Sequence, residues 1–436
     1  MAVLFRRSSD PSETGNGDGW ASTSRREPTI AEVVAERLIS AEFQPIVDLS
    51  RGETVGYEAL ARGPLGTAFE RPAPMFAAAE AAGLAWELDL AAHAAAFEAA
   101  VRARLNPLMS LFINAATPSV SGPVPDDLAP TLALAQARLR VFMEISERSL
   151  SVDPQATLLG IERARAAGWG VALDNVGVTA ASLAVMPFAN PDVVKIDVSL
   201  VHEVTHPHAP RVMNALTAHA ERTGASIMAV GIETESHVRT ARGLGAVLGQ
   251  GFHFGRPGPL PAVPRVPTHP ISLIPALGSP APGDTPFSLA TAVAPALPAA
   301  AGVLAALASH VEQRASLDPD PAVVLACLPK NQMMSGAPLA VLQMLARNAS
   351  FIAALVGDAP PYAIPDVRMV RLADKDPLRR EWTIIVLGPH YSAMLTARER
   401  ESRRDPDEFS YRLVYDRATV VRAAQVILQR LHGNAA

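Results

Sequence analysis

The chain has 436 residues, of which 49% are hydrophobic and 19% charged, so it can bury the cores of two or three domains. A net charge of −5 and a pI near 6.1 give no chain-wide basic surface, and we expect no nucleic-acid partner. The single cysteine, Cys327, excludes an intramolecular disulfide and a cysteine-based zinc site. No uncharged apolar window reaches about 18 residues. The N-terminal apolar stretch is too short for a signal peptide. We therefore expect a cytoplasmic protein without membrane insertion.

The first predicted elements form a hairpin that leads into an alternating α/β pattern. Residues 1–29 have the polar composition of a disordered tail. Two strands, within 43–49 and 53–62, flank a turn-forming Ser-Arg-Gly centre. Strands then alternate with helices, which indicates a mostly parallel sheet, and their number favours a closed barrel over an open sheet. The predicted helices are 74–104, 153–167, 209–223 and 235–244, and the later strands are SLFIN, RVFMEI, GVALDN, DVVKID, SIMAVGIE and GQGFHFG.

A proline-rich stretch divides the chain. Prolines recur every few residues between 257 and 286, which predicts a semi-rigid linker over 258–286. Residues 287–436 are then a smaller α+β or α/β domain. Its predicted elements are helices at 297–313 and 338–349, a strand at 381–387 and a closing helix at 416–431.

Each apolar run of the predicted barrel ends in a residue that can bind metal or phosphate. Any one of them has a plain explanation, because acids and amides commonly end strands. Together they matter more, because barrel active sites lie at the carboxyl ends of several strands, and converging oxygen donors suit Mg²⁺. These residues are Glu58, Asn114, Glu144, Asp174, Asn175, Lys195, Asp197, Glu233 and Gln250.

The motifs that hold these residues resemble the EAL family, enzymes that linearise the bacterial second messenger cyclic-di-GMP. EALAR at 58–62 is similar to the motif that names the family. The resemblance covers about residues 30–257, in the family's order, and implies a (β/α)8 TIM-like barrel. The other matching segments are FQPIVDL (43–49), FINAATP (112–118), MEISE (143–147), ALDNVG (172–177), VVKID (193–197), VGIETE (230–235) and QGFHFGRP (250–257).

The resemblance also implies roles for single residues. It implies Mg²⁺ or Mn²⁺ as cofactor, to polarise the phosphodiester and activate a water. Lys195 matches a lysine that contacts the water and phosphate, and Glu147 matches a glutamate that anchors the loop after the fourth metal ligand. The implied metal ligands are Glu58, Asn114, Glu144 and Asp174. The implied substrate-binding residues are Leu60, Arg62 and Gln250.

Two positions depart from the family pattern. Asn175 stands where the family has a second aspartate, and Val230 stands where it has a glutamate. Asparagine keeps a carbonyl oxygen but loses the charge, and valine can neither bind metal nor accept a proton. A positioned base is worth roughly 10²–10⁴-fold in rate, so we expect hydrolysis to be weak or absent. The loop after Asn175 also departs from the pattern, which weakens the implied anchoring by Glu147 and the implied homodimer.

The C-terminal region resembles the DICT sensory domain, a module found beside diguanylate cyclase, EAL and two-component signalling parts. The resemblance rests on 309–316, 374–399 and 405–431 and implies the sensing of an unknown ligand. It assigns no binding residue. A histidine cluster, His202, His206 and His208, invites a zinc interpretation, but a loop before the 209–223 helix explains it better.

Three functions stay open at this point. The first is a receptor that binds cyclic-di-GMP or a protein signalling partner without turnover. The second is a working phosphodiesterase in which Glu233 or Asp197 takes over the lost duty. The third is an interaction scaffold that binds no nucleotide.

Overall fold

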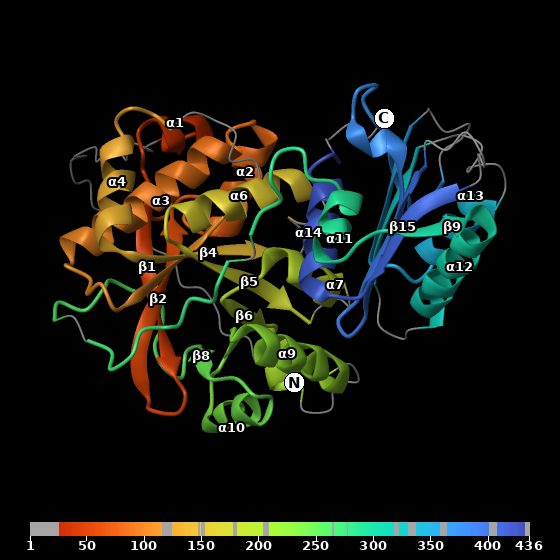
Figure 1. The fold of residues 1–436 in the computed structure, drawn as a ribbon. Helices are drawn as coiled ribbons and strands as arrows, with labels where there is room; N and C mark the ends of the chain where they lie inside the picture. The colour runs from red at the N-terminus through yellow and green to blue at the C-terminus, as the bar shows by residue number, and fades with distance from the viewer. Residues whose placement is uncertain are drawn as a thin grey trace, which may run out of the picture.

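The computed structural model places a closed barrel beside a second sheet with its own helices (Figure 1). Within the part of the chain that it describes, no helix is long and apolar enough to cross a membrane. The described residues are 26–115, 124–146, 149, 153–177, 181–203, 209–263, 266–276, 278–317, 322–329, 337–357, 364–400 and 408–431.

Eight strands close the barrel in chain order, which confirms the predicted fold. They are β1 (Ser40–Asp48), β2 (Glu53–Arg62), β3 (Ser110–Asn114), β4 (Arg140–Ser146), β5 (Gly170–Val176), β6 (Val193–Ile196), β7 (Ser226–Ala229) and β8 (Leu248–Gln250). Strands β2 to β8 pair in parallel, whereas β1 is antiparallel to both β2 and β8. The reversal arises at the predicted hairpin, where Gly52 adopts the left-handed φ of 69° that a glycine tolerates.

Helices cover the outside of the barrel (Figure 1). They are α1 (Ile30–Ala35), α2 (Pro72–Ala81), α3 (Ala85–Arg102), α4 (Ala129–Arg138), α6 (Pro154–Ala166), α7 (Ala181–Ala189), α8 (Val198–His202), α9 (Ala209–Thr223) and α10 (Glu235–Gly243). The single helix predicted over 74–104 is wrong: it is two helices, because Gly83 turns the chain with a φ of 70°. The strand predicted from 226 also ends earlier, at Ala229.

The segment expected to be a spacer packs against the barrel. Ile271 is buried in the same core cluster as Phe112 and Phe142, whose rings stack with centroids 4.7 Å apart. The buried carboxylate of Asp192 accepts hydrogen bonds from the backbone N–H groups of Val171 in β5 and Ile274 in this segment. The proline-rich chain thus lies along the barrel and completes its core, although its described residues between 259 and 285 form neither helix nor strand.

The second domain is a seven-stranded sheet in the order β12-β11-β10-β13-β14-β15-β9. Its strands are β9 (Leu297–Ala300), β10 (Val323–Leu328), β11 (Phe351–Val356), β12 (Arg368–Arg371), β13 (Glu381–Leu387), β14 (Ser392–Glu399) and β15 (Glu408–Val414). Its helices are α11 (Pro286–Val293), α12 (Ala301–Leu317), α13 (Ala337–Ala346), a short 3-10 helix (Pro377–Arg380) and α14 (Arg417–Leu428). The helix predicted from 297 begins only at Ala301, because the four residues before it pair with β15.

The two faces of this sheet have different neighbours. In β13, Ile385 belongs to the core shared with α14, whereas Ile384 packs on the other face against α12. Helix α14 also contacts α6 and α7 of the barrel, so the inner face of the sheet and the outside of the barrel share one apolar core (Figure 1). The outer face is covered by α12 and α13.

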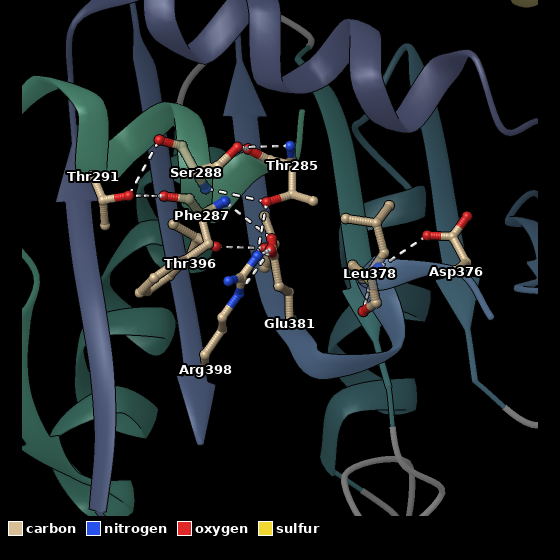
Figure 2. Close-up of polar contacts among 11 residues, drawn as sticks. Thr285, Phe287, Ser288, Thr291, Asp376, Leu378, Glu381, Thr396 and Arg398 are labelled. Atoms are coloured by element: carbon tan, nitrogen blue, oxygen red, sulfur yellow. Dashed lines mark hydrogen bonds and ion pairs between the residues drawn. The ribbon is translucent and has the colours of Figure 1, made fainter. Parts of the chain in front are cut away.

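An ion pair on a buried acid fastens the start of α11 to the sheet (Figure 2). Glu381 is fully buried and accepts hydrogen bonds from Arg398 Nε at 2.9 Å and from the backbone N–H of Phe287 at 3.0 Å. Arg398 also donates to Thr285 Oγ1, the residue that caps α11. Glu381, Arg398 and the α11 cap residue Thr285 thus form one connected set of hydrogen bonds. We call these three residues the Glu381 cluster.

Candidate functional site

Carboxylates from three barrel strands surround one lysine. Lys195 in β6 is buried, and its Nζ lies 2.8 Å from both carboxylate oxygens of Glu144. The same nitrogen lies 3.1 Å from Glu58 Oε2 and 3.6 Å from Asp174 Oδ1. These acids come from the carboxyl-end halves of β2, β4 and β5, as the strand-end pattern predicts. We call this group the Lys195 cluster.

Two amides complete the cluster. Gln250 Nε2 donates to Glu58 Oε2 at 2.7 Å and to Gln44 Oε1 at 3.1 Å. Asn114, directly beside Glu144 in the register of β3 and β4, donates from Nδ2 to Glu58 Oε1 at 3.0 Å. The predicted residues Asn114 and Gln250 therefore lie with the acids, and both oxygens of Glu58 have partners.

The pKa values of the two buried acids, Glu58 and Glu144, are shifted in opposite directions because their surroundings differ. Burial opposes the ionisation of Glu58, but the Lys195 ammonium and the amide hydrogen bonds outweigh it and hold the pKa of Glu58 below its usual value. Burial raises the pKa of Glu144 well above its usual value, and the nearby Glu58 charge adds to this effect. Burial favours loss of the proton of Lys195, but Glu144 and the other acids prevail, so the pKa of the ammonium is raised. Three acids thus share one permanent cation.

The donor types of this cluster suit a hard divalent cation, since carboxylate and amide oxygens are its preferred ligands. In the present arrangement, however, the Lys195 ammonium takes up Glu144 and Glu58. Among the described residues, no group of three or more histidine, cysteine or acidic side chains is arranged to hold a metal ion. A cation at Glu58, Asn114, Glu144 and Asp174 would therefore have to compete with Lys195 for its ligands.

A cleft of about 450 Å³ opens beside the cluster. Its walls are largely alanine and other apolar side chains, and the predicted Leu60 lines it together with Glu58, Glu144 and Asp174. Arg62 does not line this cleft. It pairs with Glu42 at 2.8 Å and borders an adjoining hollow of about 1110 Å³, which shares Pro72 and Ala73 with the cleft.

The two departing positions lie at the mouth of the barrel. Asn175 lines the cleft, has a left-handed φ of 58°, and donates from Nδ2 to Asp174 Oδ2 at 2.8 Å. Asparagine suits this position because it tolerates positive φ and can donate to the neighbouring carboxylate, which an aspartate could not do. Val230 directly follows β7 and is half-buried.

The two acids considered as replacements do not belong to the Lys195 cluster. Asp197 caps α8, where its Oδ1 accepts hydrogen bonds from the backbone and the hydroxyl of Ser199. Glu233 is exposed, and its backbone N–H donates to His237. The carboxylates that act on Lys195 are those of Glu58, Glu144 and Asp174.

Sequence reasoning missed two side chains of the cleft and the amide of Gln44. His93 Nε2 lies 2.8 Å from the backbone oxygen of Asn114 and 3.7 Å from the buried Asp89. The signal was available, since an acid and a histidine four residues apart share one face of a helix. Of the predicted residues, Glu147, His206 and His208 lie outside the described part of the chain. The ring of His202 lies against that of His237, with centroids 4.1 Å apart and the ring planes tilted by 33°.

The protein has a closed barrel and an acid-rich cleft at the carboxyl ends of the strands. It therefore belongs to the class of (β/α) barrel proteins whose functional site is formed by residues at the strand ends. The EAL domain model matches residues 29–257, just over half of the chain, and the chain therefore belongs to the EAL family. The model described as "Sensory domain in DIguanylate Cyclases and Two-component system" matches residues 288–400, so the second domain is a DICT sensory domain.

Several known proteins are similar to the barrel half. An "Uncharacterized signaling protein" of Caulobacter vibrioides is 30% identical over 238 residues, which are 53% of this chain and 29% of that protein. "Probable cyclic di-GMP phosphodiesterase PdeB" of Escherichia coli is 29% identical over 232 residues, which are 52% of this chain and 44% of that protein. The chain thus spans less than half the length of these relatives. The solved calcium/cy-diGMP complex of Klebsiella pneumoniae BlrP1 is 28% identical, covers 51% of this chain and 56% of that chain, and has a TM-score of 0.44.

Proposed function

We propose that this protein is a cyclic-di-GMP signalling receptor in which the barrel binds the nucleotide with weak or absent hydrolysis. The observation that carries the proposal is the contrast at the barrel mouth. The Lys195 cluster is intact and opens onto the cleft, whereas Asn175 and Val230 bring no carboxylate to it. Membership of the EAL family and the likeness to a probable cyclic di-GMP phosphodiesterase support the choice of nucleotide.

The residues of the cleft have separate tasks in this proposal. Lys195 supplies a fixed positive charge toward a phosphate at the bottom of the cleft, and Gln250 and Asn114 hold Glu58 in place. Leu60 and the alanine walls give the bases an apolar surface. Arg62 can reach a phosphate only after leaving Glu42, which makes it a second contact rather than an anchor. A divalent cation, when bound, would polarise the phosphodiester and lower the pKa of a water.

Hydrolysis is impaired for a specific electrostatic reason. With Asn175 and Val230 neutral, the site holds three acids against Lys195, and the pKa of Glu144 is already raised. Too little negative charge then remains to hold two dications, and no side chain at position 230 can take a proton from water. The alternative of an active phosphodiesterase would need another acid, but the Asp197 carboxylate caps α8 and Glu233 is exposed.

The test follows cyclic-di-GMP in the presence of Mn²⁺, with product formation and calorimetric binding measured in parallel. We expect binding without appreciable linear product. In the double variant Asn175→Asp with Val230→Glu, we expect turnover to rise by roughly 10²–10⁴-fold, the usual worth of a positioned base. Gln250→Leu serves as the matched binding control, because it removes the donor to Glu58 without adding charge.

Each other outcome identifies a different protein. Turnover by the parent chain that equals that of the double variant would show an active phosphodiesterase and overturn the receptor proposal. Absence of binding by both proteins would leave a scaffold. Binding by the parent that is unchanged in Gln250→Leu would place the nucleotide outside this cleft.

A further inference from the structure

The outer face of the DICT sheet contains a cavity that the barrel chemistry does not use. It has a volume of about 410 Å³ and lies between α12, α13 and strands β10 and β13. Protein interiors are close-packed, with few voids larger than a water molecule. An opening of this size lies within the range of small-molecule sites, about 300 to 1,000 Å³.

The same sheet offers an internal comparison. Its inner face is packed by α11 and α14, where Ile385 and Leu325 are fully buried. On the outer face, α12 presents three small alanines, Ala301, Ala305 and Ala308, toward the cavity beside the larger Leu304. The space therefore results from the choice of residues on α12.

The walls are mostly apolar, and Glu312 is the one ionisable side chain among the described residues that line the cavity. The large apolar side chains that line it include Leu304, Leu328, Leu342 and Trp382. Glu312 also lines the cavity, and within the described part of the chain its carboxylate makes neither a hydrogen bond nor an ion pair. Burial raises the pKa of Glu312, which is the effect of a half-buried carboxylate without a donor.

We propose that this cavity binds a small, mostly apolar molecule that carries a protonated amine, with the amine on Glu312 and the apolar body against Trp382 and the leucines. An unpaired carboxylate in an apolar wall attracts a cationic donor and repels an anion. The flat indole of Trp382 suits an aromatic or extended aliphatic body. The site lies on the outer face of the sheet, so the inference is independent of whether the barrel binds a nucleotide.

The experiment uses the full chain and three probes of nearly equal shape, namely phenylbutylamine, phenylbutanol and phenylbutyrate, titrated by calorimetry. We expect the amine to bind about tenfold more tightly than the alcohol, because a charge-assisted hydrogen bond exceeds a neutral one. The acid should bind least. Glu312→Gln should remove the preference for the amine and leave the affinity for the alcohol unchanged.

Two neighbouring positions on α12 give a matched pair of variants. Ala305 lines the cavity and Ala306 does not, and both are exposed, so a phenylalanine at either position disturbs no core. Ala305→Phe should weaken amine binding by at least about tenfold, because it fills the space the ligand body occupies. Ala306→Phe should bind the amine like the parent.

Several results would overturn the site. No detectable binding of the amine to the parent chain would do so. Equal binding by parent and Ala305→Phe would place the amine elsewhere, and an equal loss in both alanine variants would point to a change in the helix. If Ala305→Phe fails to fold, Glu312→Lys decides: it should reverse the order of the amine and the acid, and an unchanged order contradicts the role of Glu312.

Discussion

Two buried clusters of charge in this protein have opposite designs. In the barrel, the Lys195 cluster sets three acids against one ammonium and opens onto a cleft. In the second domain, the Glu381 cluster sets one acid against one guanidinium and a helix cap, and it lies within the packed layer between α11 and the sheet (Figure 2).

This difference in charge balance distinguishes the Lys195 cluster, which is a candidate binding site, from the Glu381 cluster, which links α11 to the sheet. In the Glu381 cluster, charge and hydrogen bonds are balanced, so no further ion is needed. In the Lys195 cluster, Lys195 and the amide hydrogen bonds outweigh burial and lower the pKa of Glu58, whereas burial and the Glu58 charge raise the pKa of Glu144. Perturbed groups of this kind at a cleft are typical of functional sites.

The largest effect is expected when the ammonium of Lys195 is removed from the barrel cluster. Lys195→Met should lower the free energy of unfolding by about 3 to 5 kcal/mol at pH 8, because it leaves buried carboxylates without a counter-charge. The loss should shrink as pH falls, since protonation of Glu144, whose pKa is raised, removes the repulsion. Urea unfolding with and without Mn²⁺ measures both effects.

Mn²⁺ should stabilise the Lys195→Met protein more than the parent, because the competitor for Glu58 and Glu144 is gone. Lys375→Met is the control, since Lys375 is exposed and should cost little. Equal stabilisation of both variants by Mn²⁺ would contradict the competition between lysine and metal.

The second test changes the Glu381 cluster, which links α11 to the sheet. Glu381→Gln should cost about 3 kcal/mol, because it removes a buried acid that holds Arg398 and the start of α11. Neither Mn²⁺ nor cyclic-di-GMP should rescue it, in contrast to the barrel variant. Asp374→Asn is the matched control in the same domain: its ion pairs with Arg371 and Arg379 are exposed, so urea unfolding should show a cost below about 1 kcal/mol. Equal costs would remove the distinction between buried and exposed pairs.

The smallest effect concerns a third charged group, at the contact of the two domains. Burial, assisted by Arg222 and by Arg417 of α14, lowers the pKa of His219 to about 4 from 6.5. The unfolded chain therefore binds this proton at a higher pH than the folded chain does, so stability is lost as pH falls from 6.5 toward 4. Between pH 7 and pH 5 the loss should reach about 2 kcal/mol.

His219→Gln isolates this contribution. Urea unfolding at both pH values should show a smaller loss on acidification for His219→Gln than for the parent. His269→Gln, at an exposed histidine, should keep the slope of the parent. Identical slopes in all three proteins would mean that His219 does not stay neutral at the domain contact.

Part of this architecture could be predicted because local pattern and tertiary fold agree. The apolar runs that end in Glu58, Asn114 and Glu144 are strands whose carboxyl ends meet, as in any parallel barrel. The strand predicted at 381–387 has the same bounds in the structure, because the segment is rich in aromatic and β-branched residues. The single helix predicted over 74–104 is wrong because Gly83 takes a left-handed φ of 70° and ends the first of two helices.

Other features depend on contacts between distant segments. The sequence by itself determined the family, the order of elements and the residues of the Lys195 cluster, because these follow from periodicity and from motifs in register. Only the tertiary structure decided that the proline-rich segment completes the barrel core, that Arg62 turns to Glu42, and that alanines of α12 leave a cavity near Glu312. The periodicity of helices and strands determines on which face of an element a side chain lies. Whether the space beside that side chain is filled depends on residues from segments that are distant in the sequence.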